Sequence, residues 1–138
     1  MVARYSRPAT ARISADEGKL ERWLEVELAA LGACAEVGAV PTEAAQEIHA
    51  KAKAPSPERV AEIEEKTQHD LAAFVDAVTS ELGQAGRWFH YGLTSSDVVD
   101  TALALQLRAS GELIIDGIDR AFAAVVKRAD EHRLTLTI

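Results

Sequence analysis

The sequence predicts an all-α protein in which an N-terminal helical domain is followed by the first long helix of a helical bundle. Apolar residues recur at spacings of three and four along the chain, and no segment shows the two-residue alternation of a half-buried strand. Hydrophobic residues make up 48% of the 138 residues and charged residues 27%, a composition too apolar for a disordered chain. One apolar pattern also runs without a break from Ser96 to the C-terminus. These observations predict helices packed around a common core.

The first predicted helix covers residues 15–37. Carboxylates in its first turn, Asp16 and Glu17, complement the positive end of the helix dipole, and Gly38 is a natural stop. One apolar stripe follows the helical period and consists of Leu20, Trp23, Leu24, Leu28, Leu31 and Ala35.

Two prolines divide the next part of the chain. A short helix is expected over 42–52, and the prolines at 55 and 57 break it because they disfavour the α conformation of the residue before them. A new helix begins near Pro57. After residues 67–70 the apolar pattern restarts at Leu71 and continues to Leu82, where the glycines at 83 and 86 end it.

The last predicted helix is about 36 residues long, which is long for a domain of this size. Its apolar positions recur by threes and fours, as in helices packed nearly parallel in a bundle. The wide apolar surface around Leu113 and Ile118 needs partners that the preceding helices do not supply. We therefore expect either oligomerisation or further bundle helices beyond residue 138, and we divide the chain into an N-terminal domain over 1–93 and the start of a bundle domain over 94–138.

Composition also limits the possible partners. The net charge of −7 argues against non-specific nucleic-acid binding, which depends on neutralising phosphates. No apolar run reaches the roughly 20 residues that cross a membrane. The basic N-terminus is not followed by the apolar region of a signal peptide, so we expect a cytoplasmic protein with no membrane partner. The single cysteine, Cys34, lies in an apolar helical pattern and is expected to be a small buried residue.

The segment Gly92-Leu93-Thr94-Ser95-Ser96-Asp97 is the most informative polar stretch. Thr94 and Asp97 fit the capping box that starts many helices, and capping alone explains both residues. One cap uses one hydroxyl, however, and further hydroxyls at the positive end of a helix also suit an anionic oxygen. The two roles are compatible.

The histidines do not form a metal-site pattern, because they lie about twenty or more residues apart and no HxxxH or CxxC pair occurs. We therefore expect no metal. His49 and His132 have polar helical surroundings and are expected to be solvated. His69 and His90 lie at helix boundaries beside polar groups, where a histidine can donate to a ligand or serve a purely structural role. The N-terminal Arg4 and Tyr5 offer phosphate or carboxylate contacts, or else belong to a frayed terminus.

Four motifs together resemble one family. RYSRP at 4–8, KLERWLEVELAAL at 19–31, HD at 69–70 and WFHYGLTSSDVVDTAL at 88–103 are similar to the N-terminal portion of the adenylosuccinate lyases, in the fumarase and aspartase superfamily. The last motif is specific, and the weaker ones occur in the family's order and spacing.

The resemblance implies a C–N elimination that releases fumarate from adenylosuccinate and from the related succinocarboxamide ribotide of purine biosynthesis, with no cofactor. It implies that His69 assists the acid that protonates the departing nitrogen, and that His90 holds a phosphate or carboxylate. The residues that it assigns to contacts with this anionic nucleotide substrate are Arg4, Tyr5, Gln68, His69, Asp70, His90, Thr94 and Ser95.

Two departures from the family pattern matter. Gln68 stands where the family usually has arginine, so an ion pair to the substrate is replaced by a neutral hydrogen bond. The resemblance also places the main catalytic histidine and the base serine beyond residue 138, and it implies active sites shared between the subunits of a homotetramer. We therefore expect this chain to be one part of a lyase and inactive alone. The alternative is a non-catalytic helical module that associates through its long helix.

Overall fold

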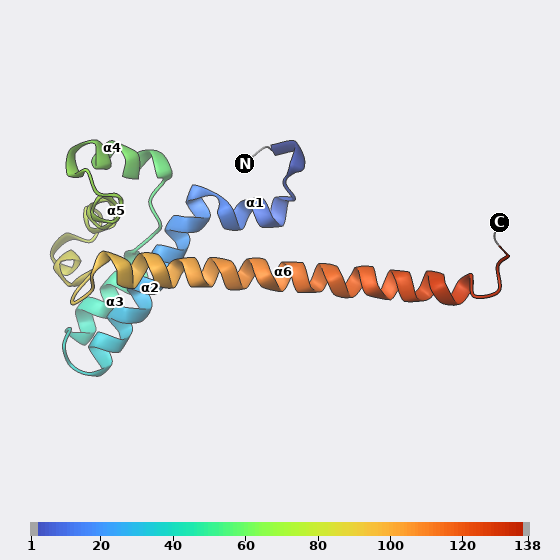
Figure 1. The fold of residues 1–138 in the computed structure, drawn as a ribbon. Helices are drawn as coiled ribbons and strands as arrows, with labels where there is room; N and C mark the ends of the chain where they lie inside the picture. The colour runs from blue at the N-terminus through green and yellow to red at the C-terminus, as the bar shows by residue number, and fades with distance from the viewer. Residues whose placement is uncertain (1–2, 137–138) are drawn as a thin grey trace.

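The computed structural model describes residues 3–136, and within that range every regular element is a helix. The elements are η1 (Ala3–Tyr5), α1 (Pro8–Ser14), α2 (Asp16–Glu36), α3 (Thr42–Lys51), α4 (Pro57–Thr67), α5 (Asp70–Thr79), η2 (Gly83–Trp88) and α6 (Ser95–Glu131) (Figure 1). The predicted all-α class is confirmed, and the five helices expected from the periodicity are present with ends within a few residues of the predicted ones.

Apart from the three-residue η1, two elements were not predicted from the periodicity. The helix α1 has only seven residues, too few for an apolar stripe, although Pro8 occupies a first-turn position that proline favours. The short helix η2 occupies the glycine-containing segment at which α5 was predicted to end. Both elements are too short to show a helical period.

A glycine allows the tight corner between α1 and α2. A Cβ atom at Gly18 would lie 2.3 Å from the backbone oxygen of Arg12, closer than atoms can approach. Gly18 is itself buried. The corner therefore brings the two helices together at a position that only glycine fills without displacing backbone.

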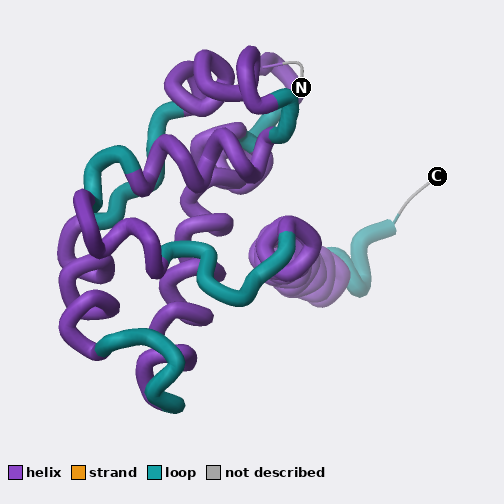
Figure 2. Tube along the Cα trace, turned by 90° about the vertical axis from the view of Figure 1, so that its left-hand side faces the viewer, coloured by secondary structure: helices purple, strands orange, loops and turns teal. Residues whose placement is uncertain are grey.

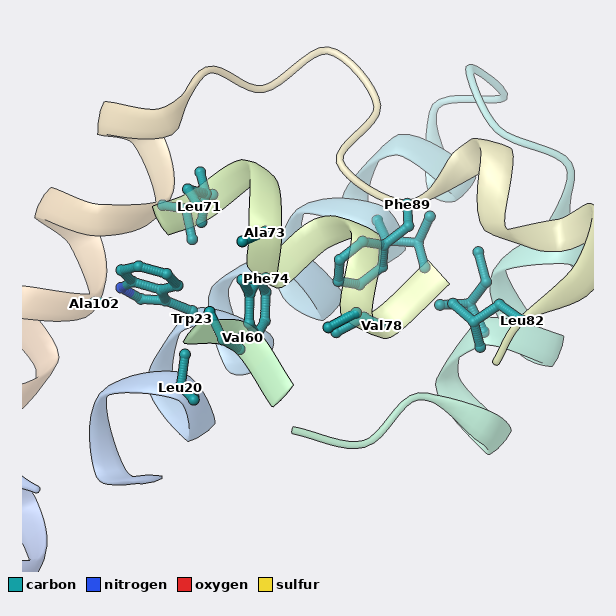
Figure 3. Close-up of a cluster of buried hydrophobic side chains, with 14 of the residues drawn as sticks. Leu20, Trp23, Val60, Leu71, Ala73, Phe74, Val78, Leu82, Phe89 and Ala102 are labelled. Atoms are coloured by element: carbon teal, nitrogen blue, oxygen red, sulfur yellow. The ribbon is translucent and has the colours of Figure 1, made fainter. Parts of the chain in front are cut away.

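Aromatic side chains from three segments form the centre of the core (Figure 3). The rings of Trp23 in α2 and Phe74 in α5 meet edge to face with centroids 5.4 Å apart, and Phe89 lies 6.3 Å from Phe74. These side chains are almost fully buried. Cys34, which was predicted to be buried, packs against this core and is partly buried.

The long helix α6 is covered only near its start. Val98 and Ala102 are completely buried, and the Gln106 side chain donates to the Ile13 backbone oxygen at 2.7 Å, which ties α6 to α1. The middle of α6 still runs beside α1, and only after that does α6 extend away from the other helices (Figure 1), which lie to one side of its axis in Figure 2. Large apolar side chains from Leu103 onward form what we term the exposed face of α6: Leu103, Leu107, Leu113, Ile114, Ile115, Ile118, Phe122, Val125 and Val126.

Two further properties concern membranes and metals. None of the helices in residues 3–136 combines the length and the apolar character needed to cross a membrane. Within the same range, no group of three or more His, Cys, Asp or Glu side chains is arranged to hold a metal ion.

Candidate functional site

A groove of about 350 Å³ lies where the start of α5 meets the segment that leads into α6. Four of the residues singled out from the sequence line it, together with apolar side chains and one carboxylate. The lining residues are His69, Leu71, Ala72, Val75, Asp76, His90, Leu93, Thr94 and Ser95. Segments about twenty residues apart in the sequence thus present their polar groups to one space.

The N-terminus of α6 has the predicted cap. Thr94 is the N-cap residue, and its backbone N–H donates to the Asp97 carboxylate at 2.9 Å, as part of the capping box. Ser95 lines the groove and its hydroxyl makes no hydrogen bond to another residue of the described chain. A hydroxyl at the positive end of a 37-residue helix therefore remains for an anionic ligand.

His69 caps the other helix at the groove. Its Nδ1 accepts a hydrogen bond of 3.3 Å from the Ala72 backbone N–H, so it occupies the N-cap position of α5. Because Nδ1 accepts, the ring proton lies on Nε2, which is then a donor. The side chain is about half exposed. His69 can therefore donate to a ligand while its backbone cap fixes the position of the ring.

The ring of His90 is hydrogen-bonded to the carboxylate of Glu27, a residue that was not predicted from the sequence to belong to the site. Its Nδ1 lies 2.6 Å from Oε1 of Glu27 in α2, a residue 63 positions away. His90 also has a φ of 61°, in the left-handed region that non-glycine residues seldom adopt. The backbone conformation and the ion-pair partner together fix this ring at the groove.

Glu27 is buried in an otherwise apolar core. Burial raises the pKa of its carboxyl, and the hydrogen bond and charge interaction with His90 lower the pKa and so oppose that shift. Its Oε2 atom has no hydrogen-bond partner in the described structure. A signal for this residue was present in the sequence, because Glu27 lies four residues after Trp23 and four before Leu31, on the buried stripe of α2.

Two residues next to His69 face elsewhere. Gln68 adopts a left-handed conformation at the end of α4, and its side-chain amide donates to the Glu65 backbone oxygen at 2.9 Å. Asp70 accepts from the Leu71 backbone N–H and lines a separate hollow of about 160 Å³ with Lys19. Neither residue lines the groove, so their assignment to a substrate site stays a prediction.

Arg4 and Tyr5 lie on η1, before α1, and both side chains are exposed. The Arg4 guanidinium stacks over the Tyr5 ring at 4.8 Å. Figure 1 shows η1 on the far side of α1 from the start of α6. These two residues are not among those that line the groove, and their predicted role would require the site to extend to them.

A larger hollow of about 530 Å³ lies where the end of α3 approaches α4 and α5. Two of its cations are already paired, Lys51 with Glu47 and Arg59 with Glu62, each at 2.6 Å. None of the predicted site residues lines it. The smaller groove therefore remains the candidate site, since polar groups from two helix starts converge on it.

Comparisons with known proteins identify the family. A family model described as Lyase matches residues 3–138. The chain is 47% identical over 138 residues to the adenylosuccinate lyase of Synechocystis sp., which covers 100% of this chain and 32% of that protein. It is 40% identical over 136 residues to the adenylosuccinate lyase of Bacillus subtilis, which covers 99% of this chain and 31% of that protein. The chain thus spans about a third of the length of these curated relatives.

Solved structures show the same fold. The crystal structure of a fumarate lyase from Mesorhizobium sp. BNC1 matches with a TM-score of 0.75 and 30% identity over 86% of this chain and 29% of that one. The β-carboxy-cis,cis-muconate cycloisomerase of Acinetobacter calcoaceticus matches with a TM-score of 0.81 and 24% identity, over 91% of this chain and 31% of that one. At that identity the second match speaks for the fold alone.

Proposed function

Because this chain belongs to the lyase family of the fumarase and aspartase superfamily, we propose that it forms one wall of an adenylosuccinate lyase active site. The reaction is a C–N elimination that releases fumarate from adenylosuccinate and from the related succinocarboxamide ribotide. A role in purine biosynthesis agrees with the cytoplasmic location predicted from the sequence.

The observation that carries this proposal is the convergence of His69, His90, Thr94 and Ser95 on one groove. These groups supply ring N–H donors, hydroxyls and the positive end of a helix, all of which suit carboxylate or phosphate oxygens. The substrate is a nucleotide that carries both kinds of anion. The groove therefore has the chemistry that recognition of such a substrate requires, although the net charge of the chain is −7.

In the proposed reaction a base removes a proton beside a carboxylate, and an acid protonates the departing nitrogen. The residues of this chain bind and orient. Thr94 and Ser95 hold substrate oxygens, and His90 holds a further anionic oxygen as negative charge builds up on the carboxylate. His69, whose Nε2 is a donor, assists at the departing nitrogen. The main acid and base come from outside these 138 residues, so we propose that the chain alone is inactive.

A chimera tests the proposal. The 138 residues replace the matching segment of the Synechocystis adenylosuccinate lyase, to which they are 47% identical, and fumarate release from adenylosuccinate is measured. We expect turnover by the chimera and none by the isolated chain. A well-folded chimera without turnover would contradict the assigned activity, and fumarate release by the isolated chain would contradict its dependence on outside residues.

The groove itself is tested by replacing Thr94 and Ser95 together with alanine in that chimera. Loss of hydroxyl contacts to charged oxygens should raise KM and lower kcat/KM by roughly tenfold or more. Ser96→Ala is the matched control, because Ser96 is the adjacent hydroxyl and does not line the groove. Equal KM and kcat/KM values in the double variant and in the control would mean that Thr94 and Ser95 only cap the helix and do not bind substrate.

The exposed face of α6 supports a second component of the proposal, assembly into a homo-oligomer. Its side chains recur at helical spacing and include Ile118 and Phe122, which are 60% and 69% exposed. A helix face of this kind is buried against other helices in bundles. We propose that copies of the chain associate here, as tetramers in the complete enzyme, and that residues 94–138 begin the bundle domain.

Association is measured by light scattering over a range of concentrations. Ile118→Glu combined with Phe122→Glu should keep the chain monomeric, because charges cannot be buried unpaired in an apolar interface. Asp119→Lys, on the neighbouring polar position, should leave association unchanged. Association of the parent without any binding of adenylosuccinate by the chimera would favour the alternative function, a non-catalytic interaction module.

A further inference from the structure

We infer that Glu27 is a positioning residue that keeps Nε2 of His90 protonated, so that His90 donates a hydrogen bond to an anionic oxygen in the groove. The inference rests on the proposed function for the identity of that anion, but the arrangement of the pair stands on its own geometry. No motif assigned a role to Glu27.

The contacts divide the two ring nitrogens of His90 between two tasks. Nδ1 lies 2.6 Å from Oε1 of Glu27, and Nε2 makes no hydrogen bond within the described residues. The Glu27 side chain is 0% exposed and that of His90 is 23% exposed. His90 also lines the groove. One nitrogen is therefore committed to the core, and the other is the polar atom that remains for a ligand.

The number of protons shared by Glu27 and His90 determines whether Nε2 of His90 is protonated. With one proton between Glu27 and Nδ1, and a second on the ring, the pair has no net charge and Nε2 carries a hydrogen. The proton between the residues can be assigned to either partner without changing Nε2. If one proton is removed, a carboxylate faces an Nδ1–H, the pair carries a charge of −1 and Nε2 becomes an acceptor.

Burial favours the neutral pair. A net negative charge at this position would lie in an apolar environment beside the core, where an unpaired ion is costly. The Oε2 atom has no partner, which would leave half of a carboxylate unsolvated. The pKa of Glu27 is raised by the same burial. The pair therefore retains its second proton, and Nε2 of His90 remains a donor.

The backbone conformation of His90 indicates that its imidazole ring is held in one position. A non-glycine residue with a φ of 61° costs about 1 kcal/mol or more and persists only where its surroundings determine it. The next residue but one, Gly92, also has a positive φ, of 74°, so the whole segment before α6 turns in an uncommon way. The hydrogen bond to Glu27 links this turn to α2.

The other titratable groups at the groove do not replace Glu27. His69 uses its Nδ1 to cap α5, and Asp76 lines the groove from the same helix. Asp76 is exposed, whereas Glu27 is buried. His90 consequently binds an anion and does not act as a base, which separates its role from that of His69.

The state of the pair can be read directly in the 138-residue chain. Nitrogen-15 NMR of the histidine rings at pH 7 should show a protonated Nε2 at His90 in the parent. In Glu27→Met the partner is replaced by an apolar side chain of similar size, and the ring should exchange between its two tautomers. An unprotonated Nε2 in the parent, or an unchanged spectrum in Glu27→Met, would overturn the inference. Methionine is a volume-conserving replacement for a buried polar group, so the fold should survive.

A double-mutant cycle in the chimera tests whether Glu27 acts through His90. Glu27→Met should raise the KM for adenylosuccinate about tenfold, and His90→Ala should raise it at least as much. The double variant should be no worse than His90→Ala alone, because the two residues form one unit. Independent effects that multiply, or an unchanged KM in Glu27→Met, would overturn the inference.

The two experiments separate this inference from the proposed function. An inactive parental chimera would count against the lyase assignment, while the NMR spectra of the 138-residue chain would still decide whether Glu27 sets the tautomer of His90. A protonated Nε2 with multiplicative kinetic effects would leave Glu27 as a core residue without a positioning role in binding.

Discussion

The two parts of α6 carry the same apolar pattern and meet opposite environments. In the first two turns, residues 95–102, Val98 and Ala102 are fully buried against the other helices. In residues 103–131 the apolar side chains recur with the same spacing, yet Phe122 is 69% exposed. Periodicity therefore shows which face of a helix is apolar, whereas the neighbouring elements decide whether that face is covered.

The largest contrast should come from two phenylalanines. Phe74 is 0% exposed at the centre of the core, so Phe74→Ala should lower the free energy of unfolding by about 3 to 5 kcal/mol, through lost burial and a cavity. Phe122→Ala in the monomeric chain should change it by no more than about 0.5 kcal/mol. Urea unfolding at low concentration measures both. Similar losses in the two variants would mean that the outer part of α6 is covered in the isolated chain.

Two glycines extend the contrast to the backbone. Gly18→Ala should cost about 1 to 3 kcal/mol, because the added Cβ meets a backbone oxygen at 2.3 Å. Gly117→Ala should instead stabilise the monomer by about 0.5 to 1 kcal/mol, since alanine favours helix and nothing lies within 4 Å of the added atom. Thermal unfolding of the two variants gives the signs. A stabilising Gly18→Ala would show that the α1–α2 corner can open.

Two aspartates on α6 should differ less. Asp97 accepts from the N-cap backbone N–H, so Asp97→Ala should cost about 1 kcal/mol. Asp116 pairs with Arg120 on an exposed surface, and Asp116→Ala should cost less than about 0.5 kcal/mol. The comparison is made by urea unfolding of single variants. An equal loss of unfolding free energy in both variants would mean that the cap stabilises α6 no more than an exposed ion pair does.

The smallest effect concerns pH. Because burial raises the pKa of Glu27 above its ordinary 4.5, the folded state holds that proton more tightly than the unfolded chain. The contribution of Glu27 to stability is thus largest below pH 4.5 and is lost as the pH rises through the folded-state pKa. Glu27→Gln should gain stability relative to the parent over that rise, when unfolding is measured from about pH 4 to about pH 8. A difference between the two chains that does not vary with pH would contradict this sign.

The fold was predictable wherever a helix is long enough to repeat its pattern. The stripe from Leu20 to Leu31 fixed the position of α2, and the paired prolines at 55 and 57 located the break before α4. The helices α1 and η2 were missed, because six or seven residues make only about two turns, too few for a pattern to repeat.

The candidate site was predictable in part. The spacing of Thr94 and Asp97 alone predicted the helix cap. The positions of His69 and His90 at helix boundaries indicated that they could contact a ligand. What spacing could not supply was the pairing of Glu27 with His90, 63 residues apart, which depends on how α2 packs against the turn before α6. Nor did spacing indicate that Gln68 would cap its own helix instead of lining the groove.

The way α6 is attached has a mechanical consequence. The whole helix is about 55 Å long at 1.5 Å per residue. Its first turns and the Gln106 hydrogen bond attach it to the other helices, and residues 107–131 account for roughly 38 Å of its length. A small tilt of α6 at its attached turns therefore produces a larger displacement near Glu131. A partner that binds the outer part of α6 is therefore joined to Thr94 and Ser95, at the groove, by one continuous helix.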